Sequence, residues 1–248
     1  MFLVNSRPWL DLQPYIDVAG LEAQRHVFAK AIAMNPHMIF TSLVGTQSNL
    51  HDQTLIELGD FAKNIQADEQ HPDHDMLKQI GSLPRFYAWC KYMYPVVGLN
   101  QAMYIRAIKK DSYGQKHLHD SCYDTPVAAE FGFLFDWIKE QNIFDQYGRV
   151  VMFINEPGVS TVLHRDYPNP TSHRNEFIWI NLGSAKRFYV YDDAADEKHY
   201  IDSRVVYFDN ANWHGSDPSQ YASWSLRIDG VYSNDFLCRS GTHAHFRK

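Results

Sequence analysis

The feature of this sequence that most constrains its fold is a series of short β-rich runs in the second half of the chain. From residue 149 onward, turn residues separate runs rich in apolar and β-branched residues, namely RVVMFIN, STVLHRD, EFIWINL, KRFYVYD, HYIDS, RVVYFD and ASWSLRIDGVYS. Many short strands in close succession are typical of an antiparallel sandwich or a small barrel. We therefore expect segment 149–235 to form a β-rich core.

The first half of the chain carries mainly helical patterns. Apolar residues at three-and-four spacing predict amphipathic helices in 20–35 and 53–66. Further along we expect a helix at 83–95, a strand at 99–110, and a helix at 125–144 with Thr125 as its N-cap and Pro126 in its first turn. Because no linker separates the halves, we expect residues 1–248 to form one α+β domain in which region 1–148 supports the sheets and shapes a pocket.

Composition argues against several classes of protein. The formal net charge of −6 has the wrong sign for a protein that binds nucleic-acid phosphates. No apolar run reaches the roughly 20 residues of a membrane-spanning helix, no secretory signal is evident, and the three cysteines show no paired spacing. We therefore expect a cytoplasmic protein with reduced cysteines and no membrane partner, and its oligomeric state stays open. Its 13 histidines, several beside carboxylates, direct attention to metal chemistry.

The strongest candidate for a metal site begins in the run STVLHRD. His164 and Asp166 are two residues apart, so on a strand their side chains point to the same face. His214, in the sequence DNANWHGSD at the end of the run RVVYFD, is the candidate third ligand. Two imidazoles and one carboxylate leave other coordination positions open, which is the arrangement of non-haem Fe(II) oxygenases.

A basic residue follows the candidate ligands. Arg227 lies thirteen positions after His214 in the alternating run SWSLRID. A strand antiparallel to the one that carries His214 would return this arginine to the site. Its guanidinium could then form a bidentate pair with a carboxylate.

The stretch 149–233 resembles the Fe(II)/2-oxoglutarate-dependent dioxygenase superfamily. That family's motif is His-x-Asp, a distal His and a basic residue about ten to fourteen positions further on, and His164, Asp166, His214 and Arg227 match it in order and spacing. The resemblance implies a double-stranded β-helix, which is a cupin-like jelly-roll, with Fe(II), 2-oxoglutarate as cosubstrate and O2. It also implies that Arg227 anchors the far carboxylate of 2-oxoglutarate. Hydroxylation is the expected outcome, and desaturation or demethylation stays open.

Other residues are candidates for binding the cosubstrate or the substrate. The family often places an amide or phenol near Asn155, and Asn181 shares a predicted strand face with Phe177 and Trp179, so both asparagines are candidates for cosubstrate binding. Lys186 is a rival to Arg227 as the anchor, because some cupin-like relatives use this central strand. His173 and Arg174 are candidates for binding the substrate. His117, His119 and Asp120 lie in segment 111–124, where they form either a second metal set or part of a lid over the pocket.

The expected function is hydroxylation of a small polar substrate. An amino acid, an amino-acid-like metabolite or the equivalent protein side chain would fit the resemblance. One alternative is a nucleic-acid demethylase of the same superfamily, which the acidic net charge disfavours. The other is a non-catalytic jelly-roll binding module that has kept the fold without the chemistry.

Overall fold

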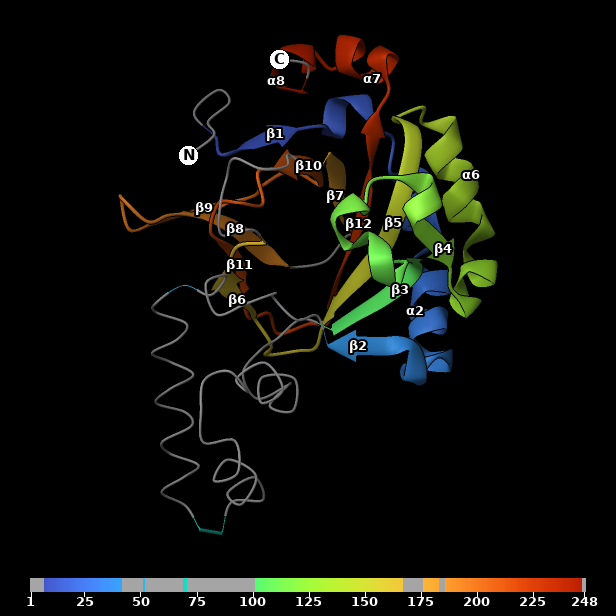
Figure 1. Cartoon of the computed structure of the whole chain (residues 1–248). Helices are drawn as coiled ribbons and strands as arrows, with labels where there is room; N and C mark the ends of the chain where they lie inside the picture. Colours follow the sequence, from blue (N-terminus) through green and yellow to red (C-terminus); the bar gives the residue numbers. More distant parts are fainter. Residues whose placement is uncertain are drawn as a thin grey trace.

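Two antiparallel sheets form the framework of the protein (Figure 1). The computed structural model describes residues 7–41, 51, 69–70, 101–166, 176–182 and 186–246. The large sheet contains, in spatial order, β1 (Trp9–Asp11), β10 (Val205–Phe208), β7 (Phe177–Asn181), β12 (Ser223–Tyr232), β5 (Phe144–Asn155), β3 (Gln101–Ile108) and β2 (Ile39–Thr41), with β4 (Cys122–Asp124) beside β3. The small sheet contains β6 (Thr161–His164), β11 (His214–Asp217), β8 (Arg187–Asp192) and β9 (Glu197–Tyr200).

The chain winds back and forth between the two sheets. From β5 onward, β5, β7, β10 and β12 belong to the large sheet, and β6, β8, β9 and β11 belong to the small one. Aromatic side chains join the inner faces, because the ring of Phe188 on β8 lies 4.9 Å from Trp179 on β7 and 5.2 Å from Phe208 on β10. This is the expected double-stranded β-helix, with helices packed outside it in an α+β fold.

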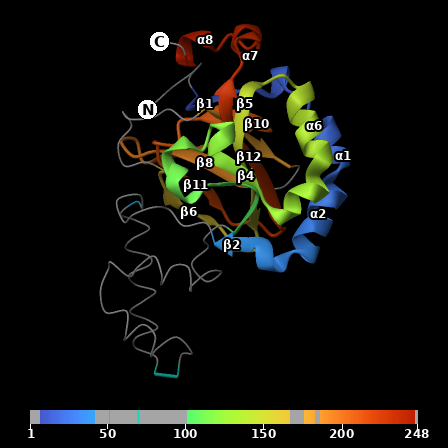
Figure 2. The ribbon, with the colours of Figure 1, turned by 45° about the vertical axis from the view of Figure 1, so that its right-hand side comes forward.

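Helices cover the outer face of the large sheet (Figure 2). They are α1 (Ala19–Ala23), α2 (Arg25–Met34), the 3-10 segment η7 (Pro126–Phe131) and α6 (Gly132–Glu140). Their buried side chains join those of the strands in one apolar cluster, which includes Leu21, Phe28, Phe131, Leu134, Met103, Met152 and Leu226. The large sheet is therefore buried on both faces, apolar toward the helices and partly polar toward the small sheet.

The remaining helical elements are short. They are η1 (Gln13–Tyr15), η2 (Pro36–Met38), η5 (Lys110–Gln115), η6 (His119–Ser121), α7 (Asn234–Arg239) and α8 (His243–Phe246). None of the described helices combines the length and the apolar character that crossing a bilayer requires. Cys122 is buried, Cys238 is exposed, and both are free thiols. Cys90 lies outside the described residues.

The structure modifies the predicted helices. The prediction for 20–35 is confirmed, with a break at Gln24 between α1 and α2. The prediction for 125–144 is wrong in detail, because the first turns are 3-10 and α6 ends at Glu140. Thr125 does not cap a helix with its side chain, because its hydroxyl donates to the carbonyls of Tyr104 and Ile105 instead. The predicted helices at 53–66 and 83–95 lie outside the described residues.

The predicted strands are present, with additions. Each of the seven β-rich runs contains or overlaps a strand, and the strand predicted at 99–110 is β3. Region 1–148, expected to be mainly helical, also contributes β1 to β4 and the first residues of β5, so it extends the large sheet as well as covering it. His214 does not end the preceding run, because it begins a separate strand, β11.

Candidate metal centre

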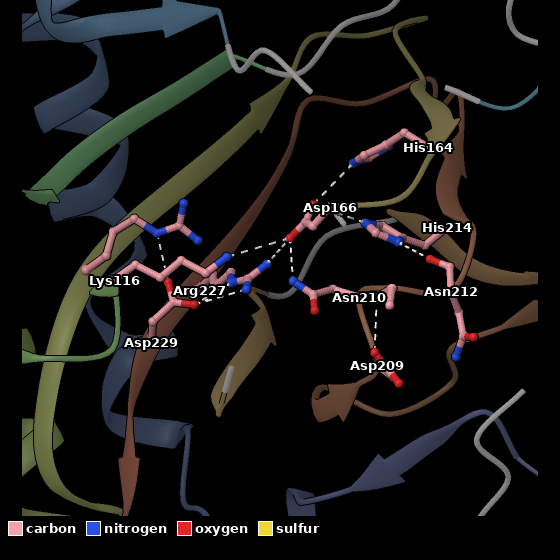
Figure 3. A network of polar contacts seen from close by, with 11 residues as sticks. Lys116, His164, Asp166, Asp209, Asn210, Asn212, His214, Arg227 and Asp229 are labelled. Atoms are coloured by element: carbon pink, nitrogen blue, oxygen red, sulfur yellow. Dashed lines mark hydrogen bonds and ion pairs between the residues drawn. The ribbon is translucent and has the colours of Figure 1, made fainter. Parts of the chain in front are cut away.

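The structure brings the three predicted ligands together at one end of the small sheet (Figure 3). His164 on β6 and His214 on β11 are direct partners in the antiparallel register, and their ring centroids are 4.3 Å apart. Asp166 follows the end of β6, and its Oδ1 lies 3.8 Å from the Nε2 atom of each histidine. One ligand atom from each residue therefore faces a shared space.

The two imidazoles are held in the tautomer that a metal needs. His164 Nδ1 lies 2.7 Å from the carbonyl of Val162, and His214 Nδ1 lies 2.8 Å from the carbonyl of Asn212. A carbonyl oxygen only accepts, so each Nδ1 carries the hydrogen and each Nε2 keeps its lone pair. Burial lowers the pKa of both rings, and together with the neighbouring His164 it lowers the pKa of His214 to about 3. Both rings are thus neutral ligands.

The carboxylate of Asp166 is ionised in a cationic environment. Burial alone would raise its pKa, but the cations of Arg227 and Lys116 outweigh burial and hold the pKa well below the usual range. Oδ2 accepts hydrogen bonds from Asn210 at 2.5 Å and Arg227 at 2.9 Å. Asp166 is therefore a charged ligand at neutral pH.

These residues fit a divalent transition-metal ion. Two ligands that each lie about 2.1 Å from an ion can be at most about 4.2 Å apart, and the two Nε2–Oδ1 distances of 3.8 Å satisfy that limit. Nitrogen and carboxylate donors suit such an ion, and three protein ligands leave coordination positions open. Within the described part of the chain, no other group of His, Cys, Asp and Glu brings three possible ligand atoms so close together.

Lys186 lies buried in the barrel beside the metal centre. Its ammonium donates to Asn155 Oδ1 at 2.8 Å and to the hydroxyl of Ser225 at 3.4 Å, and Asn155 Nδ2 is 3.5 Å from the hydroxyl of Thr161 on the strand that carries His164. Among the residues that the structure describes, no carboxylate pairs with Lys186. Burial lowers the pKa of this amine to about 7. A buried cation with only neutral partners favours an anionic ligand.

Arg227 reaches the metal centre from the opposite sheet. Its strand, β12, pairs with β5 and β7, so the expectation that it lies antiparallel to the strand of His214 is wrong. The guanidinium binds two carboxylates, those of Asp166 and of Asp229, and it lies 3.9 Å from the ring centroid of Phe177. Unlike Lys186, Arg227 is already neutralised within the protein.

The other predicted site residues have varied positions. Asn181 is in register with Ser225 on β12, and Trp179 with Arg227, so the predicted shared face of β7 points into the barrel. His119 contacts Arg106 and Asp120 rather than a second ligand set that includes His117. His173 and Arg174 lie outside the described residues.

Four residues around the metal centre were not predicted from the sequence, namely Asn210, Asp229, Lys116 and Arg149. Asp229 accepts a hydrogen bond from Arg149 Nε at 2.8 Å, and Lys116 Nζ lies 4.0 Å from Asp166 Oδ2. Burial, Arg227 and Arg149 lower the pKa of Lys116 to about 7. The alternation of Arg227 and Asp229 on one strand was a usable signal for Asp229, because residues two apart share a face. No comparable signal pointed to the others.

Comparison with known proteins gives weak structural similarities. No protein-family description matches the sequence, and no curated protein matches it. A Pseudomonas putida prolyl-4-hydroxylase structure is 12% identical and covers 57% of this chain and 81% of its own, with a TM-score of 0.32. A Burkholderia pseudomallei oxidoreductase of the 2OG-Fe(II) oxygenase family is 13% identical over 56% of this chain and 73% of its own, with a TM-score of 0.35. A Bordetella pertussis cupin domain is 14% identical over 37% of this chain and 86% of its own, with a TM-score of 0.25.

Proposed function

We propose that the protein is a non-haem Fe(II)- and 2-oxoglutarate-dependent oxygenase that hydroxylates a small polar substrate or the equivalent protein side chain. The observation that carries this proposal is the presence of two complementary sites in one barrel. One is an open-sided set of two neutral imidazoles and a carboxylate, and the other is the buried ammonium of Lys186. An iron ion suits the first site and the carboxylate of a 2-oxo acid suits the second.

In this proposal, different residues of the barrel bind the iron and the 2-oxoglutarate. His164, Asp166 and His214 would hold iron, which when bound supplies the oxidation of substrate by O2, coupled to decarboxylation of 2-oxoglutarate to succinate. We assign the far carboxylate of 2-oxoglutarate to Lys186 rather than to Arg227, because the charge of Arg227 is neutralised by Asp166 and Asp229. We assign the amide of Asn155 and the hydroxyls of Thr161 and Ser225 as further donors to the same carboxylate, because Asn155 and Ser225 contact Lys186 and Thr161 contacts Asn155.

The substrate that we propose is an amino acid, a similar metabolite or the equivalent protein side chain. An amino acid or a similar metabolite is proposed because polar and charged side chains surround the metal ligands, and the sequence 167–175 that follows Asp166 contains His173 and Arg174. We expect Arg174→Ala to raise the substrate concentration needed for half-maximal rate and to leave substrate-free decarboxylation of 2-oxoglutarate nearly unchanged. A metabolite screen for stimulated succinate release would identify the substrate.

The proposal is tested by loading the protein with Fe(II) and 2-oxoglutarate without oxygen. Chelation of the iron by the 2-oxo acid gives a visible absorption band, and admission of O2 should then release succinate. Lys186→Ala should raise the 2-oxoglutarate concentration for half-maximal band intensity at least tenfold, because a charged pair contributes about 2 kcal/mol or more. His164→Ala should abolish the band.

The matched control is Lys198→Ala, which removes a partly exposed lysine of the neighbouring strand β9. It should leave the titration unchanged. If the protein binds iron but shows neither the band nor succinate, the non-catalytic binding module becomes the better description. If Arg227→Ala weakens 2-oxoglutarate binding while Lys186→Ala does not, the anchor is Arg227.

A further inference from the structure

The two oxygens of Asp166 lie in different surroundings (Figure 3). Oδ1 faces the two Nε2 atoms, each 3.8 Å away. Oδ2 faces the opposite way and accepts hydrogen bonds from Asn210 Nδ2 and Arg227 NH1, at 2.5 and 2.9 Å. Because a carboxylate oxygen has two lone pairs in the carboxylate plane, these two donors occupy the acceptor positions of Oδ2.

Arg227 is itself firmly held. Its Nε donates to Asp229 Oδ1 at 3.0 Å, and Asp229 is fully buried and also accepts from Arg149. The guanidinium is packed on the ring of Phe177. A buried arginine fixed by a carboxylate and an aromatic ring holds each donor in a set direction, and here NH1 points to Asp166 while NH2 lies 3.0 Å from Asp229 Oδ1.

Asn210 is fixed by the same short turn that positions His214. The backbone N–H of Asp166 donates to the carbonyl of Asn210 at 2.8 Å, so the turn between β10 and β11 is bonded to Asp166 through both backbone and side chain. Two residues later the carbonyl of Asn212 accepts from the His214 ring. This turn therefore sets the position of two of the three ligands.

We propose that Arg227 and Asn210 are positioning residues that restrict Asp166 to binding a metal ion through Oδ1 alone. Chelation through both oxygens would require Oδ2 to give up its hydrogen bonds to Arg227 and Asn210. The restriction keeps one additional coordination position free for exchangeable ligands. The inference rests on the metal site of the proposed function and assigns a separate role to the basic residue that the sequence motif contains.

The test counts water molecules on a bound Mn(II) ion by proton relaxation, with no 2-oxoglutarate present. In an ion with six coordination positions, three protein ligands leave three waters, and a chelating Asp166 would leave two. Arg227→Met removes the donor and keeps most of the side-chain length. We expect relaxivity per bound Mn(II) to fall by about one third in Arg227→Met, with metal affinity equal to or above that of the unchanged protein.

Three variants complete the design. Arg227→Lys retains one donor and should restore the relaxivity. Asn210→Ala should lower the relaxivity in the same direction as Arg227→Met, and it decides the question alone if circular dichroism shows that Arg227→Met does not fold. Arg106→Met is the matched control, because it removes a buried arginine that contacts His119 and Asp124 rather than Asp166 or Asp229, and it should keep the relaxivity of the unchanged protein.

Two results would overturn the inference, and they are distinguishable. If Arg227→Met and Asn210→Ala bind Mn(II) with unchanged relaxivity per ion, the two residues have only a structural role, and the metal site of the proposed function stands. If the unchanged protein and His164→Ala bind Mn(II) equally, the metal site itself is wrong, and the inference falls with it.

Discussion

At the scale of single residues, the metal ligands and the buried apolar side chains have separable roles. His164, Asp166 and His214 supply the ligand atoms, whereas burial of apolar surface supplies most of the stability of a domain. Removing one ligand should therefore weaken metal binding with little effect on the folded structure.

We expect His164→Ala, Asp166→Ala and His214→Ala each to abolish turnover and to weaken iron binding, because two remaining ligands hold such an ion poorly. Isothermal titration with Fe(II) under nitrogen would measure the loss, and circular dichroism would check the fold. Asp166→Gly should retain modest metal affinity without hydroxylation. A variant with full activity would remove its residue from the ligand set.

Lys186 gives the site a dependence on pH. Burial lowers the pKa of its ammonium to about 7, and only the charged form would pair with the cosubstrate's carboxylate. Affinity for 2-oxoglutarate should thus be full below pH 7 and should fall above it, by up to about tenfold per pH unit. Titrations of the metal-loaded protein from pH 6 to pH 9 would measure this dependence.

Lys186→Arg is the control for that experiment, because a guanidinium stays charged over the whole range. The side chain at position 186 then stays charged, so the affinity of this variant for 2-oxoglutarate should not fall between pH 7 and pH 9. A slope that persists unchanged in Lys186→Arg would assign the titration to another group.

The metal ligands could be predicted from the sequence, and the distinction between the two cations could not. His164 and Asp166 share a strand face because of their spacing alone, and the distal histidine completes a recognisable set. Whether Arg227 or Lys186 carries an unneutralised charge depends on Asp166 and Asn155, which approach from other parts of the fold. Spacing along one strand contains no information about such partners.

At the scale of secondary-structure elements, Gly148 on β5 permits a close approach of two segments. A Cβ atom at this position would lie 2.2 Å from the carbonyl oxygen of Lys116 and 2.9 Å from the carbonyl carbon of His117. That approach allows the N–H of Arg149 to donate to the Lys116 carbonyl at 2.8 Å. The segment that carries Lys116 therefore packs directly against β5.

Gly148→Ala should force these segments apart and cost about 1 to 3 kcal/mol of folding free energy, as overpacking does. Urea denaturation would measure the loss. Gly132→Ala is the control, since a Cβ at Gly132 meets nothing within 4 Å and the residue begins α6, where alanine is favourable. Equal stability of Gly148→Ala and the unchanged protein would contradict the proposed clash.

Elements with strong periodicity could be predicted, and short polar ones could not. The apolar runs predict β5, β7, β8, β10 and β12. In contrast, β11 (His214–Asp217) has the sequence HGSD and shows no alternation of apolar residues. It is a strand because β6 and β8 flank it on both sides. Tertiary pairing of this kind overrides local propensity.

At the scale of the whole molecule, the helices and the barrel share one apolar core. Phe28 on α2 is fully buried, and its ring lies 5.3 Å from Phe131 and 5.5 Å from Phe133 in the segment that covers the large sheet. The outer helices are therefore part of the structure that holds the sheets in place.

Phe28→Ala should lower the free energy of unfolding by about 3 to 5 kcal/mol, because it removes a large buried ring. Thermal unfolding of the metal-free protein would measure this loss of stability. Met34→Ala is the control, since Met34 on the same helix is 66% exposed. A loss of similar size in both variants would show that the helix contributes through its propensity rather than through its buried face.

The acceptors of the two ligand imidazoles have an evolutionary consequence. Each ring is oriented by a main-chain carbonyl two residues earlier in the chain, that of Val162 for His164 and that of Asn212 for His214. No side-chain substitution can delete a carbonyl, so drift at positions 162 and 212 can proceed without changing the tautomer of either ring. We expect mutational scanning to find these two positions permissive wherever the new residue keeps the local backbone conformation. The orientation of the histidines is thus robust to sequence divergence in a way that the side-chain contacts of Asp166 are not.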